Sequence, residues 1–114
     1  MPCIQLNVSK KIDESHEISI KSKLGKAIAL LPGKSENWLM ITFKDEMPIY
    51  FKGSKDTPAA FVAVGVYGRE DGSAFDKLTA KICEILGEEL GIPADHIYVQ
   101  YTATSHWGWN GGNF

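Results

Sequence analysis

The chain has 114 residues, of which 44% are hydrophobic and 23% are charged. This composition is typical of one soluble globular domain and excludes a disordered, collagen-like or mucin-like chain. Twelve lysines and arginines stand against 14 aspartates and glutamates, so the formal net charge is -2 and there is no basic surplus of the kind that a dedicated nucleic-acid binder shows. We therefore expect a single domain over residues 1–114 with no nucleic-acid partner.

The first half of the chain is predicted to form a strand, a helix and a second strand. Residues 3–8 alternate between apolar and other side chains, as in a strand with unlike faces. Apolar residues then recur at helical spacing from about Asp13 to Leu31, and Pro32-Gly33 ends the helix. Residues 38–43 are apolar almost throughout, which predicts a strand covered on both faces.

A turn and a second strand-helix-strand unit follow. Asp45-Glu46 and Pro48 indicate the turn, and residues 49–51 are predicted to form a short edge strand. Apolar residues 58–67 predict the next long strand, and residues 68–72 a charged loop. Ser73 is a candidate cap for a helix that runs to Leu90 and ends at Gly91 and Pro93. Residues 97–101 predict the last strand, and residues 107–110 with a glycine-rich tail close the chain.

The repeated order of elements predicts the fold class. We expect an α+β domain in which two pseudo-repeated β-α-β units form one four-stranded mixed sheet with two helices on one face. Residue identity between the halves is slight, so the alternative is that the repeat only reflects how common β-α-β units are. The second face of the sheet, which we expect to be apolar, would stay bare in a monomer and therefore predicts a subunit interface.

Neither a membrane segment nor a metal site is indicated. The longest apolar run, residues 27–32, is too short to cross a bilayer, and the alternating N-terminus lacks the apolar core of a secretory signal. Cys3 and Cys83 form no CxxC pair, and no spacing of Cys and His residues fits a zinc site. We expect a cytoplasmic protein, or one exported without a signal peptide, that has no membrane partner and needs no metal or cofactor.

Pro2 is the most informative residue for function. Met1 is expected to be removed because the second residue is small, which leaves Pro2 with a free secondary amine at the start of a strand. Burial and a nearby lysine would lower the pKa of that amine, so that it is uncharged at neutral pH and can move a proton to and from carbon. The alternative is that Pro2 follows Met1 by chance and lies in solvent.

Several other segments accompany Pro2 in a recognisable order. They are Met1-Pro2, Gly33-Lys34, Thr57-Pro58-Ala-Ala, Tyr67-Gly68, the segment from Gly91 to Tyr101, Gly108-Trp109-Asn110 and Phe114. With these residues the sequence resembles the macrophage migration inhibitory factor family of the tautomerase superfamily over essentially its full length. The resemblance implies the same α+β fold, assembled as a homotrimer in which three sheets form a barrel.

The resemblance also implies roles for individual residues. Pro2 would be the catalytic base, and Lys34 would bind the substrate's carboxylate; the alternative for Lys34 is a solvated lysine after a helix end. The substrate-binding positions implied by the family are Tyr67, Tyr98, Gln100, Trp38, Trp107 and Trp109. Tyr98 and Gln100 would come from the neighbouring subunit. Tyr67 and Trp107 replace smaller residues and Gln100 an asparagine, while packing alone is an equal alternative for Trp109.

Three functions remain open from the sequence. The first is a cofactor-independent keto–enol tautomerase of the phenylpyruvate or dopachrome type, acting on a small aromatic α-keto acid. The second is a cytokine-like secreted or host-mimicking ligand that contacts a receptor. The third is a β-α-β binding module without catalysis, which a retained Met1 would favour. Residues 59–62, Ala-Ala-Phe-Val, lack the CxxC of vertebrate members, so no redox pair is expected, and surface or turn roles are expected for His16, His96 and His106.

Overall fold

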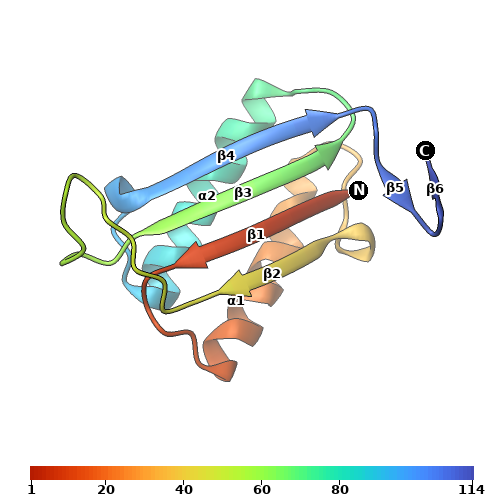
Figure 1. Ribbon diagram of the computed structural model, residues 1–114. Coiled ribbons are helices and arrows are strands. Elements are labelled where there is room, and N and C mark those ends of the chain that lie inside the picture. Colours follow the sequence, from red (N-terminus) through yellow and green to blue (C-terminus); the bar gives the residue numbers. More distant parts are fainter.

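The computed structural model describes residues 1–114 and contains one four-stranded sheet with two helices behind it (Figure 1). The strands lie in the order β2 (Met40–Lys44), β1 (Pro2–Val8), β3 (Ala60–Tyr67) and β4 (Ile97–Thr104). β1 is parallel to β2 and antiparallel to β3, while β3 and β4 are parallel. The predicted mixed sheet, with both helices on one face, is therefore confirmed.

The core forms where the sheet meets the helices. Alternate residues of β1 and β3 are buried against them, because side chains in a strand point to opposite faces in turn. These are Ile4, Leu6, Val8, Val62, Val64 and Val66. The predicted periodicity of both helices supplies the other side of the core, including Ile20, Leu24, Ile28, Leu78, Ile82, Ile85 and Leu86.

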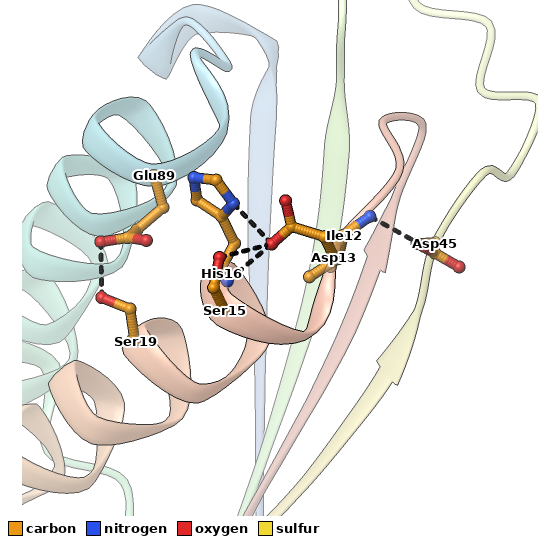
Figure 2. Close-up of polar contacts among 7 residues, drawn as sticks. All are labelled: Ile12, Asp13, Ser15, His16, Ser19, Asp45 and Glu89. Atoms are coloured by element: carbon orange, nitrogen blue, oxygen red, sulfur yellow. Dashed lines mark hydrogen bonds and ion pairs between the residues drawn. The ribbon is translucent and has the colours of Figure 1, made fainter.

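Helix α1 (Glu14–Ala27) begins at a capping aspartate. Asp13 has an extended backbone, and its carboxylate accepts hydrogen bonds from the His16 backbone N–H at 2.9 Å and the Ser15 hydroxyl at 2.9 Å (Figure 2). These bonds, led by that from the His16 backbone, lower the pKa of Asp13 to about 2. The helix ends four residues before Leu31, and a 3-10 turn (Ile28–Leu30) completes the predicted segment because Pro32 disfavours a helical Leu31.

Helix α2 (Gly72–Leu90) is capped by Asp71, and the prediction that Ser73 is the cap is wrong. Asp71 is the last extended residue before the helix, and its carboxylate accepts a hydrogen bond from the Ala74 N–H at 3.1 Å. Ser73 already lies inside the first turn. Gly91, with φ of +67°, ends the helix as predicted. The Ser19 hydroxyl of α1 donates to the Glu89 carboxylate of α2 at 2.8 Å, which joins the two helices (Figure 2).

The segment between the halves differs from its prediction. β2 starts at Met40, because residues 36–38 form a 3-10 turn (Glu36–Trp38), and the strand lies at the sheet edge with its side chains exposed or half-buried rather than covered on both faces. Residues 49–51 form no edge strand. Phe51 and Ser54 pair only with each other, because the two-residue turn at Lys52 and Gly53 folds this segment back on itself.

The bare face of the sheet is less apolar than predicted. Residues of the opposite parity to the core face it, and they mix polar with apolar side chains: Cys3, Gln5, Asn7, Met40, Thr42, Lys44, Phe61, Ala63, Gly65, Tyr98, Gln100 and Thr102. We call this surface the open face. It lies uncovered in the single chain. The strands are almost continuously hydrophobic in sequence mainly because of the residues that face the helices.

A small hairpin ends the chain. β5 (Gly108–Trp109) and β6 (Gly112–Asn113) are joined by Asn110 and Gly111, both with positive φ, of 52° and 84°. Asn-Gly is the pair that such a two-residue turn favours, so this hairpin could have been predicted from the sequence. A third 3-10 turn (Ala94–His96) precedes β4. No helix in the chain combines the length and the apolar character needed to span a bilayer.

Candidate active site

The N-terminus lies at the end of the sheet at which β3 and β4 finish (Figure 1). Because β1 runs antiparallel to β3, Pro2 lies opposite Val66, and the Tyr67 N–H donates to the Met1 carbonyl at 3.0 Å. Pro2 is buried, whereas Met1 is half-buried. The alternative that Pro2 lies in solvent is therefore wrong for this chain.

Lys34 is brought to the N-terminus by the turn after α1. Gly33 has φ of +76°, a conformation that glycine adopts readily, and the Lys34 N–H closes the turn on the Leu31 carbonyl at 3.0 Å. The Lys34 ammonium then donates to the Tyr67 carbonyl at 2.7 Å. This contact holds a positive charge next to the first residue of the chain.

Burial and the charge of Lys34 both act on the amine of Met1. Burial, the larger cause, lowers the pKa of this amine because it disfavours the charged form, and the nearby Lys34 ammonium lowers it further. The Pro2 nitrogen is separated from this amine only by the Met1 Cα and carbonyl carbons. An amine at Pro2 would therefore lie in nearly the same surroundings.

Four aromatic rings form a wall beside the N-terminus. Trp38 meets Trp109 edge to face, with ring centroids 5.2 Å apart. Phe114 stacks on Trp109 at 6.1 Å and lies 5.4 Å from Tyr67. The hairpin thus joins residues from the turn before β2 and from the end of β3 into one aromatic cluster, which is suited to contact a planar apolar group.

Two hollows meet at Met1. The larger, of about 600 Å³, is lined by Met1, Pro2, Cys3, Asn37, Trp38, Leu39, Met40, His106, Trp107, Gly108 and Trp109. The smaller, of about 210 Å³, is lined by Met1, Trp38, Tyr67 and Phe114. We call the larger one the N-terminal hollow. Met1 and Trp38 line both hollows, and Pro2 lines the larger one.

Two predicted site residues lie elsewhere in the chain. Tyr98 lies opposite Phe61, which lies opposite Asn7. Asn7 is at the far end of β1, roughly 16 Å from Pro2 at the usual rise per strand residue. The ring of Tyr98 contacts Phe51, with centroids 5.3 Å apart. Gln100 lies opposite Ala63, halfway along the edge strand β4 on the open face. The single chain therefore brings together Pro2, Lys34, Tyr67, Trp38, Trp107 and Trp109, but not these two.

Two residues of the site were missed. His106, for which a surface or turn role was expected, lines the N-terminal hollow, and Phe114 completes the aromatic wall. The Asn-Gly turn was the available signal for Phe114, since it folds the tail back toward Trp107. Cys3 also lines this hollow, and burial raises the pKa of its thiol. No group of three or more His, Cys, Asp or Glu side chains lies close enough to hold a metal ion.

Comparison with known proteins identifies the family of the chain. The family model described as Macrophage migration inhibitory factor (MIF) matches residues 1–114. The chain belongs to the MIF family. A curated MIF from Xenopus laevis is 30% identical over 98 residues, which are 84% of each chain. The crystal structure of Leishmania major MIF2 has a TM-score of 0.93 and 38% identity and covers 100% of this chain and 97% of its own.

A second solved structure shows the same likeness. The MIF homologue of Prochlorococcus marinus has a TM-score of 0.82 and 30% identity, with 98% of each chain covered. Family membership confirms the predicted MIF resemblance and places the chain in the tautomerase superfamily, which supports an isomerase in general terms.

Proposed function

We propose that this MIF-family chain is a keto–enol tautomerase that uses Pro2 as its base and acts on a small aromatic α-keto acid such as phenylpyruvate. One observation carries the proposal: the Met1 amine, next to Pro2 in the chain, lies beside Lys34 and a hollow with an aromatic wall, and burial and the Lys34 charge lower the pKa of that Met1 amine. A base with a lowered pKa is free to accept a proton near neutral pH.

The proposed reaction moves one proton between carbon and the base. In enolisation the free Pro2 amine accepts a proton from the carbon next to the ketone and then gives a proton to the carbonyl oxygen. Ketonisation is the reverse: the free amine accepts the hydroxyl proton of the enol and delivers a proton to carbon. The amine is free before and after each turnover, so no atoms or electrons are gained or lost overall. Orientation and a matched pKa are sufficient for such a transfer.

Lys34 is proposed to bind the substrate's carboxylate. Its ammonium is half-buried and uses the Tyr67 carbonyl as one partner, which leaves further N–H donors for an anion. The substrate's ring would then lie against Trp38, Trp109, Trp107 and Tyr67. A dopachrome-like substrate, which is also planar and carries a carboxylate, fits the same description.

Met1 must be removed for this mechanism. While Met1 is attached, the Pro2 nitrogen is part of a peptide bond and has no basic lone pair. The Met1 side chain also lies between the two hollows that a substrate would need to enter. Removal would therefore supply both the base and the space.

A second copy of the chain is proposed to complete the site. Tyr98 and Gln100 lie on the open face and away from Pro2 of their own chain, and Tyr98 is 63% exposed. In a homotrimer each open face would meet its neighbours, so these two side chains can reach an adjacent N-terminal hollow. The homotrimer and the roles of Tyr98 and Gln100 are parts of this proposal.

The test combines the mass of the N-terminus with turnover of phenylpyruvate enol. Protein that begins at Pro2 should accelerate ketonisation, and Pro2→Gly or retained Met1 should lower kcat/KM by about a hundredfold or more. Pro48→Gly, in an exposed turn, is the matched control and should keep the parental rate. Equal thermal melting of all variants would show that they are folded. A Pro2→Gly variant as active as the parent would exclude Pro2 as the base.

A further inference from the structure

A tryptophan on the open face separates two hollows of the molecule. Trp107 and Cys3 line the N-terminal hollow, and the same two residues line a second hollow of about 400 Å³ together with Gln5, Ala63, Val64, Gly65 and Thr102. We call this second space the sheet hollow. Trp107 is therefore the large side chain that stands between the space next to Pro2 and the open face.

The indole of Trp107 rests on a glycine. A Cβ built on Gly65 would lie 3.7 Å from Cη2 and 3.8 Å from Cζ3 of Trp107. A methyl group there would just touch the ring, whereas a branched side chain would overlap it. Gly65 is the middle of β3, between Cys3 of β1 and Thr102 of β4, where a glycine costs stability and offers no packing of its own. The close approach of the indole is a physical reason for a glycine here.

Trp107, whose indole lies against Gly65, is connected to the aromatic wall through the backbone. The Phe114 N–H donates to the Trp107 carbonyl at 3.1 Å, directly before the hairpin that carries Trp109. Phe114 in turn packs against Tyr67. The position of Trp107 on the sheet thus affects where the whole hairpin lies.

We propose that Trp107, seated on Gly65, closes the candidate active site toward the open face and limits the substrate to one planar ring system, single or fused. Gly65 is a positioning residue, because it acts through Trp107 and does not reach the substrate. This inference rests on the proposed function and makes its substrate class narrower. Without the indole, the N-terminal hollow and the sheet hollow would become one space, and a substrate with two linked rings would find room.

The test compares phenylpyruvate with biphenylylpyruvate, whose second ring needs the extra space. The parent should prefer phenylpyruvate. Trp107→Ala should raise the ratio of kcat/KM for biphenylylpyruvate to that for phenylpyruvate by about tenfold or more, the usual effect of opening an apolar pocket. Gly65→Val should change the ratio in the same direction because it unseats the indole, while a strand tolerates valine well. Gly65→Ala and Ala63→Val, the matched controls, should keep the parental ratio.

A second measurement does not depend on catalysis. The Gly65 Hα resonances of the parent should be displaced by the ring current of Trp107, and this displacement should vanish in Trp107→Ala. Binding of the two keto acids, followed by NMR titration, should show the same selectivity as turnover. If the parent binds selectively but does not catalyse, the tautomerase proposal fails, whereas the inference that Trp107 limits the size of the ligand still holds. An undisplaced Gly65 signal, or unchanged selectivity in Trp107→Ala, overturns this inference.

Discussion

At the scale of single residues, the proposed chemistry depends on one amine and one lysine that are far apart in the sequence. Gly33 turns the chain so that the Lys34 ammonium reaches the Tyr67 carbonyl. The Tyr67 N–H in turn donates a hydrogen bond to the Met1 carbonyl. The charge of Lys34 therefore lies where it can lower the pKa of the N-terminal amine. Neither residue has an unusual neighbour in the sequence, so their relation comes from the fold.

Removal of the Lys34 charge should change the pH dependence of the reaction. The base is active when deprotonated, so kcat/KM rises with pH through the pKa of the amine. Lys34→Gln removes the second cause of the lowered pKa and leaves burial, so the rising limb should move to higher pH. At neutral pH we expect kcat/KM to fall roughly tenfold for each pH unit by which the rising limb moves. The KM for the carboxylate substrate should also rise.

Lys26→Gln is the matched control, because Lys26 is an exposed lysine of the last turn of α1. Its pH profile of kcat/KM should superimpose on that of the parent. If the limb of Lys34→Gln also coincides with the parental one, Lys34 has no electrostatic effect on the base.

At the scale of elements, helix ends decide where the site residues lie. The turn after α1 carries Lys34, and the loop before α2 follows Tyr67 directly. Asp71 stabilises the start of α2 through the Ala74 N–H, and the predicted cap, Ser73, does not. The error has a simple cause: Asp71 and Ser73 are both good capping residues, and only the backbone conformation shows which one is extended.

The two capping candidates can be separated by unfolding experiments. Asp71→Ala should lower the free energy of unfolding by about 1 kcal/mol, because the Ala74 N–H loses its acceptor. Asp71→Ser restores an acceptor at the same place and should recover most of this loss. Ser73→Ala should leave stability nearly unchanged. The measurement is urea unfolding followed by circular dichroism, and a larger loss in Ser73→Ala than in Asp71→Ala would reverse the assignment.

At the scale of the whole molecule, the helices cover one face of the sheet and the open face stays free (Figure 1). This face carries exposed aromatic side chains, Phe61 at 38% and Tyr98 at 63% exposure, among polar ones. A surface of this mixed kind is compatible with an interface between subunits that each fold on their own. It is also the surface that holds Tyr98 and Gln100, the two predicted site residues that lie away from Pro2 of their own chain.

We expect the parent to sediment at three times the mass of one chain. Phe61→Arg should weaken the assembly, since it adds a charge to the open face, and tautomerase activity should fall with it. Ile18→Arg is the matched control, because Ile18 is an apolar residue of α1 that is 59% exposed and lies on the helix side of the molecule. Analytical ultracentrifugation distinguishes the outcomes, and a parent that sediments as a monomer contradicts the trimer.

Much of the fold could be predicted from local patterns. The alternation of residues 3–8, the helical spacing before Leu31 and the glycine after Leu90 each reflect contacts within a few residues, which the sequence records directly. The start of β2 was less predictable. Trp38 and Leu39 are as apolar as strand residues, but Trp38 is the last residue of a 3-10 turn and Leu39 follows it. Apolar character alone does not separate these structures.

The amino-acid sequence was sufficient for the order of the four main strands and two helices, the family and the candidate residues Pro2 and Lys34, because these follow from short patterns and their succession. Only the folded chain brought Lys34 to the N-terminal amine, His106 into the hollow beside Pro2, and Trp107 onto Gly65. Each of these contacts joins segments far apart in the sequence. Their geometry depends on how strands pair and where loops close, and no local pattern of residues records it.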